Sequence, residues 1–305
     1  MVDINGRISN FGNSATVSTV PICMALPRVS PVVSPLAYRR ATLAALILLG
    51  VIVVTGAAVR LSDSGLGCSD WPTCDQHHLI RVSSLHQSIE QGNRLFTGLV
   101  VVAVVAAVLG SLRRRPYRRD LVWLSWGLVI GVIGQIVLGG IAVLTHLNPA
   151  VVAGHFLLSI ALVTDAVVLH FRASHDEEVR ESTPFLRWMG WALLAAAAAV
   201  IVMGTVVTGT GPHGGDEHAH RFQFVMTDVA RIHSLFVWVL VALTAWLAWR
   251  TRHPAVTILL AVEVAQGAVG YTQYFLGVPP LLVAVHIVGV LGVWIAAVRV
   301  KLVFR

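Results

Sequence analysis

The sequence predicts an all-α polytopic membrane protein whose eight transmembrane helices form two pseudo-symmetric four-helix bundles. Hydrophobic residues make up 56% of the 305 residues and charged residues only 12%, about half the charged share of a soluble domain. The apolar residues gather in eight spans that are long enough to cross a bilayer, and the motifs of the first four spans recur in the last four. This composition excludes a soluble enzyme and a disordered chain.

The region before the first span, residues 1–38, is predicted to be a disordered cytoplasmic tail. No basic segment followed by an unbroken apolar run indicates a cleaved signal peptide there. Helical periodicity is broken by four prolines: Pro21, Pro27, Pro31 and Pro35. The eight apolar spans then lie near residues 41–60, 85–110, 120–143, 150–171, 186–209, 228–250, 254–275 and 281–301.

Arginine and lysine in the short loops predict the orientation of the chain. Residues 113–119 contain five arginines, and most other basic residues flank the ends of spans on the same side. Cytoplasmic loops carry such an excess, so we expect both termini to be cytoplasmic and the loops 61–84 and 210–227 to face outward. The same bias accounts for the net charge of +7 and leaves no reason to expect a nucleic-acid partner.

An internal repeat predicts how the eight spans are organised. Gln135 lies 20 residues before His155, and Gln266 lies 20 residues before His286. Four crossings return a chain to its starting side, so two copies of four helices share one orientation and are related by an axis along the membrane normal. The N-terminal half, the cytoplasmic linker and the C-terminal half are expected over residues 39–172, 173–185 and 186–305.

Three histidines are predicted to share one layer of the membrane. His155, His233 and His286 each lie about five residues into a span that runs inward, which is about 8 Å below the outer surface. Polar groups in lipid are functional candidates, and imidazoles that face each other in a bundle suit haem iron better than zinc. The alternative is that each histidine hydrogen-bonds a neighbouring helix.

The two halves differ in what faces the histidine layer. His233 and His286 form a complete pair, which predicts a six-coordinate, electron-transfer haem in the C-terminal half. In the N-terminal half, the position that corresponds to His233 in the repeat is occupied by Asn93. Because asparagine is a poor iron ligand, the iron bound by His155 is expected to have its other axial position open or filled by another group. His86, seven residues before Asn93 on the same helical face, is the alternative ligand.

Glu90 is expected to point toward the same site, because it shares that face of the helix. A buried carboxylate there suits substrate oxidation, and the alternative is an ion pair with Arg94. Arg94 and Arg231 lie near the outer ends of their spans, where they are expected to pair with haem propionates or with lipid headgroups.

Two outer loops and one later span contain further candidate functional residues. Cys68 and Cys74 are expected to form a disulfide on the oxidising outer side. The cluster of His213, His218 and His220 is interpreted as a solvated loop rather than a metal site, and Glu263 as a packing residue, with a proton path as the alternative.

Over residues 41–301 the sequence resembles the haem A synthases, membrane enzymes that act on haem O. The resemblance rests on the His233 and His286 helices and on the motifs VTGAAVRLSDSGLGCSDWPTC, HQSIEQGNRL, LGGIAVLTHLNPAVVAGH and VVTGTGPHGGD. It implies oxidation of the C8 methyl of haem O to a formyl group by successive hydroxylations, which gives haem A for cytochrome oxidase. Many members of the family carry His where this chain has Asn93.

The resemblance also implies the site residues and partners. His233 and His286 look like the haem b ligands, His155 like a ligand of the substrate haem, Glu90 like the family's acid, and Cys68 and Cys74 like its outer-loop pair. A haem O synthase would supply the substrate, and a quinone or a thiol carrier would accept electrons. We expect a multi-pass protein in contact with lipid in a bacterial plasma membrane, and leave a homo-oligomer open. A cytochrome b electron carrier and a transporter with a proton relay are the alternatives.

Overall fold

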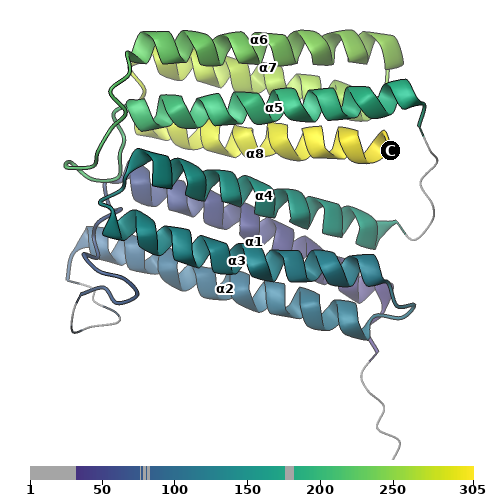
Figure 1. Cartoon of the computed structure of the whole chain (residues 1–305), viewed down its shortest axis with the longest axis horizontal. Coiled ribbons are helices and arrows are strands. Elements are labelled where there is room, and N and C mark those ends of the chain that lie inside the picture. Colours follow the sequence, from purple (N-terminus) through teal and green to yellow (C-terminus); the bar gives the residue numbers. More distant parts are fainter. Residues whose placement is uncertain (1–31, 76, 78–79, 81–82, 176–181) are drawn as a thin grey trace, which may run out of the picture. The chain divides into compact units, whose positions relative to one another are not determined.

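The computed structural model describes residues 32–75, 77, 80, 83–175 and 182–305, and within these residues it consists of helices joined by loops. The predicted fold class is confirmed. Eight helices are long and apolar enough to cross a membrane (Figure 1). Their bounds are α1 Pro35–Leu61, α2 Leu85–Arg113, α3 Arg119–Leu144, α4 Pro149–Ser174, α5 Pro184–Thr210, α6 Met226–Thr251, α7 Pro254–Phe275 and α8 Pro280–Val303.

Proline and short polar residues determine where the helices begin. Five helices, α1, α4, α5, α7 and α8, have proline in their first turn, where its fixed φ suits the helix and its missing N–H costs nothing. Side-chain caps precede several of them. The Ser34 hydroxyl accepts a hydrogen bond from the Ala37 amide, and the Thr183 hydroxyl accepts one from the Leu186 amide.

The predicted boundary of the N-terminal tail is wrong by several residues. Helix α1 begins at Pro35 instead of near residue 41, because Pro35 starts a helix rather than breaking one. Val33 also pairs through its backbone with Arg113 and Arg115 of the α2–α3 connection. The rest of the predicted tail, residues 1–31, and residues 176–181 of the predicted linker lie outside the described residues.

The helix contacts divide the described helices into two groups of four. Neighbours in the first group are α1 with α2, α2 with α3, α3 with α4 and α4 with α1, and the second group repeats this ring with α5 to α8. In the described residues, the backbones of α2 and α4 do not approach each other, and neither do those of α6 and α8. These two pairs are therefore the diagonals of the two bundles. The halves meet where α8 packs on α1 and α4, and where α4 packs on α5 (Figure 1).

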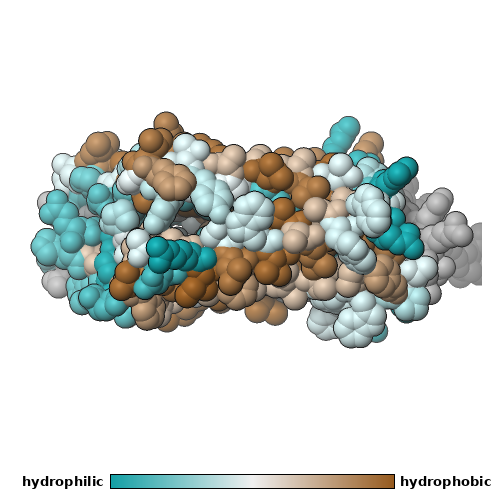
Figure 2. Space-filling model, turned by 90° about the horizontal axis from the view of Figure 1, so that it is seen from above, coloured by the Kyte–Doolittle hydropathy of each residue, from teal (hydrophilic) through white to brown (hydrophobic). Residues whose placement is uncertain are grey.

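The lateral surface around the bundles suits a lipid environment. Large apolar side chains are exposed along the helices, among them Val102, Ile130 and Trp188. Figure 2 shows hydrophobic residues over the middle of the molecule and hydrophilic residues at its two ends. Such an apolar belt between polar ends is the pattern of a protein that spans a bilayer. This pattern agrees with a multi-pass membrane protein.

Candidate functional site

The three predicted histidines lie on diagonal helices of the two bundles. His155 is on α4, and His233 and His286 are on α6 and α8. The Nδ1 atom of each ring is buried and has no hydrogen-bond partner among the described residues. Hydrogen bonding through Nδ1 to a neighbouring helix therefore does not account for His155 or His286, whereas the backbone of Val200 on α5 lies within reach of the His233 ring.

A glycine of the adjacent helix lies against each imidazole ring. The Cε1 atoms of His155, His233 and His286 lie 3.4, 3.3 and 3.2 Å from where a Cβ would project on the neighbouring glycine. The three glycines are Gly139 on α3, Gly204 on α5 and Gly270 on α7. A side chain longer than a methyl group at these positions would displace the ring. The glycines therefore fix how closely each histidine ring approaches the wall of its bundle.

A glutamine holds the backbone of two of the histidines in the same way in both halves. The Gln135 Nε2 donates to the carbonyl oxygen of His155 at 3.1 Å, and the Gln266 Nε2 donates to that of His286 at 2.8 Å. The repeat found in the sequence is therefore a repeated contact between α3 and α4 and between α7 and α8. Sequence reasoning identified the repeated spacing of the glutamines and histidines but not this contact.

Asn93 faces a cavity in the first half. Its Oδ1 accepts a hydrogen bond of 2.8 Å from the Thr55 hydroxyl of α1. The cavity has a volume of about 280 Å³, and its lining is apolar apart from these two residues: Thr55, Ala58, Val59, Ile89, Gly92, Asn93 and Phe96. Because α2 and α4 are diagonal, the first bundle presents an amide and a cavity where the second presents His233.

Glu90 lies at the end of α2 that adjoins the loop 62–84, called the outer end here after the predicted orientation, and is only 5% exposed. Its Oε1 accepts hydrogen bonds from the Arg94 Nη2 at 2.6 Å and Nε at 3.1 Å, so the ion pair considered as an alternative is present. Its Oε2 accepts one from the Cys68 amide at 2.7 Å. A buried ion pair persists only where further hydrogen bonds satisfy its remaining atoms, and the outer loop supplies them here.

Arg94 extends this contact along the outer loop. It donates to the carbonyl oxygens of Asp70 and Thr73, each at 3.2 Å. Arg231, its counterpart near the outer end of α6, differs: its side chain is 81% exposed and lies 3.7 Å from Asp228. The two arginines predicted to play the same part therefore lie in different environments.

The predicted disulfide between Cys68 and Cys74 is confirmed, and both residues are buried. Trp71 lies inside the closed loop and packs on α3, with ring atoms 2.7–3.0 Å from where a Cβ on Gly140 would project. Gly140 follows Gly139, which contacts His155. The disulfide loop therefore covers the outer end of the first bundle next to His155.

His86 contacts the same loop, between α1 and α2. Its Nδ1 lies 2.9 Å from the Ser64 hydroxyl, and the residue is exposed. Close approach to the backbone of His86 requires glycine at Gly67, where a Cβ would lie 2.7 Å from the His86 carbonyl.

The two repeated outer loops are joined to each other. The Gly65 amide donates to the Gly215 carbonyl oxygen at 2.8 Å, and the Arg60 Nη2 donates to the Thr208 carbonyl oxygen at 3.0 Å. Burial lowers the pKa of Arg221 in the second loop, and the charge of Asp63 in the first loop partly offsets this. Sequence reasoning predicted that both loops face outward but not that they bond to one another.

The histidine-rich second loop shows no metal cluster within the part of the chain that the structure describes. The His213 Nε2 lies 2.8 Å from the Val278 carbonyl oxygen in the α7–α8 connection. His218 is solvent-exposed and lies 3.4 Å from Asp216. In the second bundle, Glu263 is buried, and its Oε1 accepts a 3.0 Å hydrogen bond from the Thr244 hydroxyl.

The sequence is similar to known proteins. A model of the COX15-CtaA family, described as "Cytochrome oxidase assembly protein", matches residues 39–91 and 80–212. A protein named "Heme A synthase" from Exiguobacterium sibiricum is 31% identical over 166 residues, which are 53% of this chain and 56% of that protein.

Proteins of the same name come from two further bacteria. The one from Oceanobacillus iheyensis is 29% identical over 42% of this chain and 43% of its own length, and the one from Geobacillus kaustophilus is 30% identical over 34% and 33%. The chain thus spans about half, or less, of the length of these relatives. The family match extends over more than half of the chain, and the chain belongs to the COX15-CtaA family.

Proposed function

We propose that this protein is a haem A synthase, which oxidises the C8 methyl of haem O to a formyl group. The observation that carries the proposal is the asymmetry of the two bundles. One diagonal carries His233 and His286, whereas the other carries His155 on α4 and Asn93 on α2, beside a cavity between α1 and α2. A protein that only carried electrons would be expected to have two complete histidine pairs. The relatives named "Heme A synthase" support the same conclusion.

The C-terminal half fits a resident haem b. His233 and His286 would hold it, because their Nδ1 atoms are buried without hydrogen-bond partners in the described residues and their rings lie against glycine. Haem b would supply one-electron redox chemistry at this position. Arg231, exposed at the outer end of α6, would interact with its propionates.

The N-terminal half is the proposed site of the substrate. His155 would be the protein ligand to the iron of haem O. The Asn93 amide oxygen already accepts a hydrogen bond from Thr55, so Asn93 is not proposed to bind the iron. The cavity that it lines would admit a water molecule as the second ligand of the iron. His86 is the less favoured ligand, because its Nδ1 is hydrogen-bonded to Ser64.

Glu90 is the proposed catalytic residue. Removal of electrons from the methyl group builds positive charge, which a fixed carboxylate nearby stabilises. Arg94 and the Cys68 amide hold both oxygens of Glu90 in place. Arg94 is therefore proposed to position Glu90 and the disulfide loop rather than to bind a propionate.

The proposed reaction defines the partners. Oxidation of a methyl to a formyl group with oxygen from water releases four electrons and four protons, so a quinone, or a thiol carrier in its disulfide form, must accept the electrons. A haem O synthase would supply the substrate, and haem A would pass to cytochrome oxidase. The basic residues around 113–119 favour a bacterial plasma membrane location with both termini in the cytoplasm.

The haems that copurify with the protein test this function. The chain is expressed in a host that makes haem O but no haem A, and the extracted haems are separated by chromatography. Haem A together with haem B is the expected result. Haem B alone would overturn the synthase in favour of an electron carrier, and the absence of haem would favour a transporter. His286→Ala is the control, because it is expected to remove the resident haem b.

A further inference from the structure

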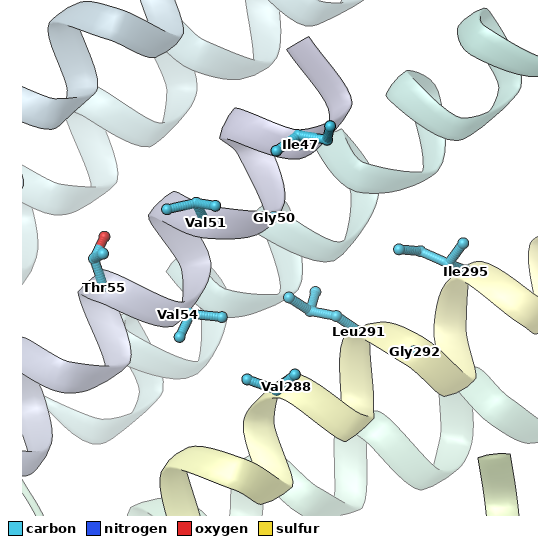
Figure 3. Close-up of a pocket in the computed structure, with 9 residues that line it drawn as sticks. All are labelled: Ile47, Gly50, Val51, Val54, Thr55, Val288, Leu291, Gly292 and Ile295. Atoms are coloured by element: carbon cyan, nitrogen blue, oxygen red, sulfur yellow. The ribbon is translucent and has the colours of Figure 1, made fainter. Parts of the chain in front are cut away.

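A groove on the membrane-facing side of the molecule lies between α1 and α8, where the two halves meet. Its volume is about 370 Å³, and apart from Thr55 its lining is apolar or glycine: Ile47, Gly50, Val51, Val54, Thr55, Val288, Leu291, Gly292 and Ile295. Figure 3 shows Val54 of α1 and Leu291 of α8 pointing into the space between the two helices. The groove therefore suits a flexible hydrocarbon chain.

The groove is adjacent to the proposed substrate site. Thr55 lines both this groove and the cavity that holds Asn93, and its hydroxyl bonds the Asn93 amide. Ile47, Val51 and Thr55 are spaced four residues apart, so they form one stripe along α1. The stripe extends about 12 Å from the Asn93 cavity toward the cytoplasmic end of α1.

The chemistry of haem O matches this geometry. Its farnesyl chain of three isoprene units is on a pyrrole ring opposite one that carries a propionate. Propionates prefer the polar outer end of the bundle, so the farnesyl chain must point toward the membrane interior. From the proposed site, this is the direction in which the groove runs. Resting on the proposed function, we infer that the α1–α8 groove binds the farnesyl chain of haem O and selects it over haem B.

Gly50 offers a way to fill the groove without disturbing the bundle. A Cβ at Gly50 would meet no atom within 4 Å, so a side chain there extends into the groove instead of displacing a neighbour. Gly50→Leu should fill much of the space, and Gly50→Ala should fill less of it. Gly98→Leu is the matched control, because Gly98 on α2 also has nothing within 4 Å and lines neither cavity.

The experiment compares the affinities of the full-length protein for haem O and for haem B. Protein that already carries haem b is purified from a host without haem O, and each haem is titrated while the Soret absorption is followed. Gly50→Leu is expected to weaken haem O binding by about tenfold or more, with haem B binding within about twofold of wild type. Gly50→Ala should give a smaller loss, and Gly98→Leu should bind both haems like wild type.

The outcomes separate this inference from the proposed function. If wild-type protein binds haem O tightly and Gly50→Leu weakens both haems equally or neither, the groove does not hold the farnesyl chain and is filled by lipid acyl chains. If wild-type protein binds no haem O beyond its haem b content, the proposed function fails together with the inference.

Discussion

Glu90 combines two tasks in the proposed mechanism. Its oxygens hold the outer loop through the Cys68 amide and the Arg94 guanidinium, and its charge is proposed to stabilise a substrate in the first bundle. These tasks depend on different properties of the side chain, because an amide oxygen can accept the same hydrogen bond without carrying charge. A conservative substitution at Glu90 can therefore separate them.

Glu90→Gln should slow catalysis strongly while leaving the fold intact. The rate of haem A formation is expected to fall by about 10²-fold or more, because the stabilising charge is lost. The haem b spectrum and the Cys68–Cys74 disulfide should remain, since the amide still accepts from the Cys68 N–H. Haem A is measured by chromatography, the disulfide by thiol alkylation, and Glu217→Gln in the outer loop is the control. Haem A formation at the wild-type rate would refute a catalytic role for Glu90.

The sequence predicted most residues of the candidate site at the level of residue types. It predicted the layer of three membrane histidines and the disulfide, and it offered the Glu90–Arg94 ion pair as an alternative. These features depend on periodicity and spacing along the chain. It did not identify the contact of Trp71 with Gly140 or the hydrogen bond from the Cys68 amide to Glu90. Both depend on the path of an outer loop, and that path is not encoded in a repeating pattern.

Helix pairs are the units that place the histidines. The α3–α4 pair and the α7–α8 pair each use a glutamine to bind a histidine carbonyl and a glycine to admit the histidine ring. Placing a glutamine side chain within the membrane costs free energy unless the side chain is hydrogen-bonded. The repeated bond therefore fixes the relative position of the two helices at the layer where the haems are proposed to bind.

Loss of one glutamine should weaken the haem site of its own half only. Gln266→Leu removes a bond worth about 1 kcal/mol, so the protein should retain haem b about fivefold less strongly. Gln135→Leu is the matched control and should leave haem b retention unchanged while weakening haem O binding. Haem b is quantified as its pyridine complex after dialysis against a haem acceptor. Equal loss of haem b in the two variants would contradict this account.

The boundaries of the helices were predicted less well than their existence. All eight spans are present, since a long apolar run has few alternatives to a transmembrane helix. The start of α1 was placed too late because Pro35 was interpreted as a helix breaker, whereas at the first turn it favours a helix. Hydropathy alone does not distinguish these two roles of proline.

The whole molecule consists of two bundles that share one plan but differ in chemistry. The two outer loops bond to each other through Gly65 and Gly215, and α8 packs on both α1 and α4. The halves are therefore joined at the outer surface and within the membrane. We therefore propose that the second bundle binds a haem through two histidines, whereas the first leaves one side of its haem free at Asn93.

Electron paramagnetic resonance of the oxidised protein loaded with haem O tests this claim most directly. We predict equal amounts of a low-spin signal from haem b and a high-spin signal from haem O, because a water ligand opposite His155 gives a weaker field than a second histidine. Asn93→His should convert the high-spin signal to low-spin, and the reciprocal His233→Asn should remove the low-spin haem b signal. Two low-spin signals in the wild-type protein, or a high-spin signal that persists in Asn93→His, would contradict the account.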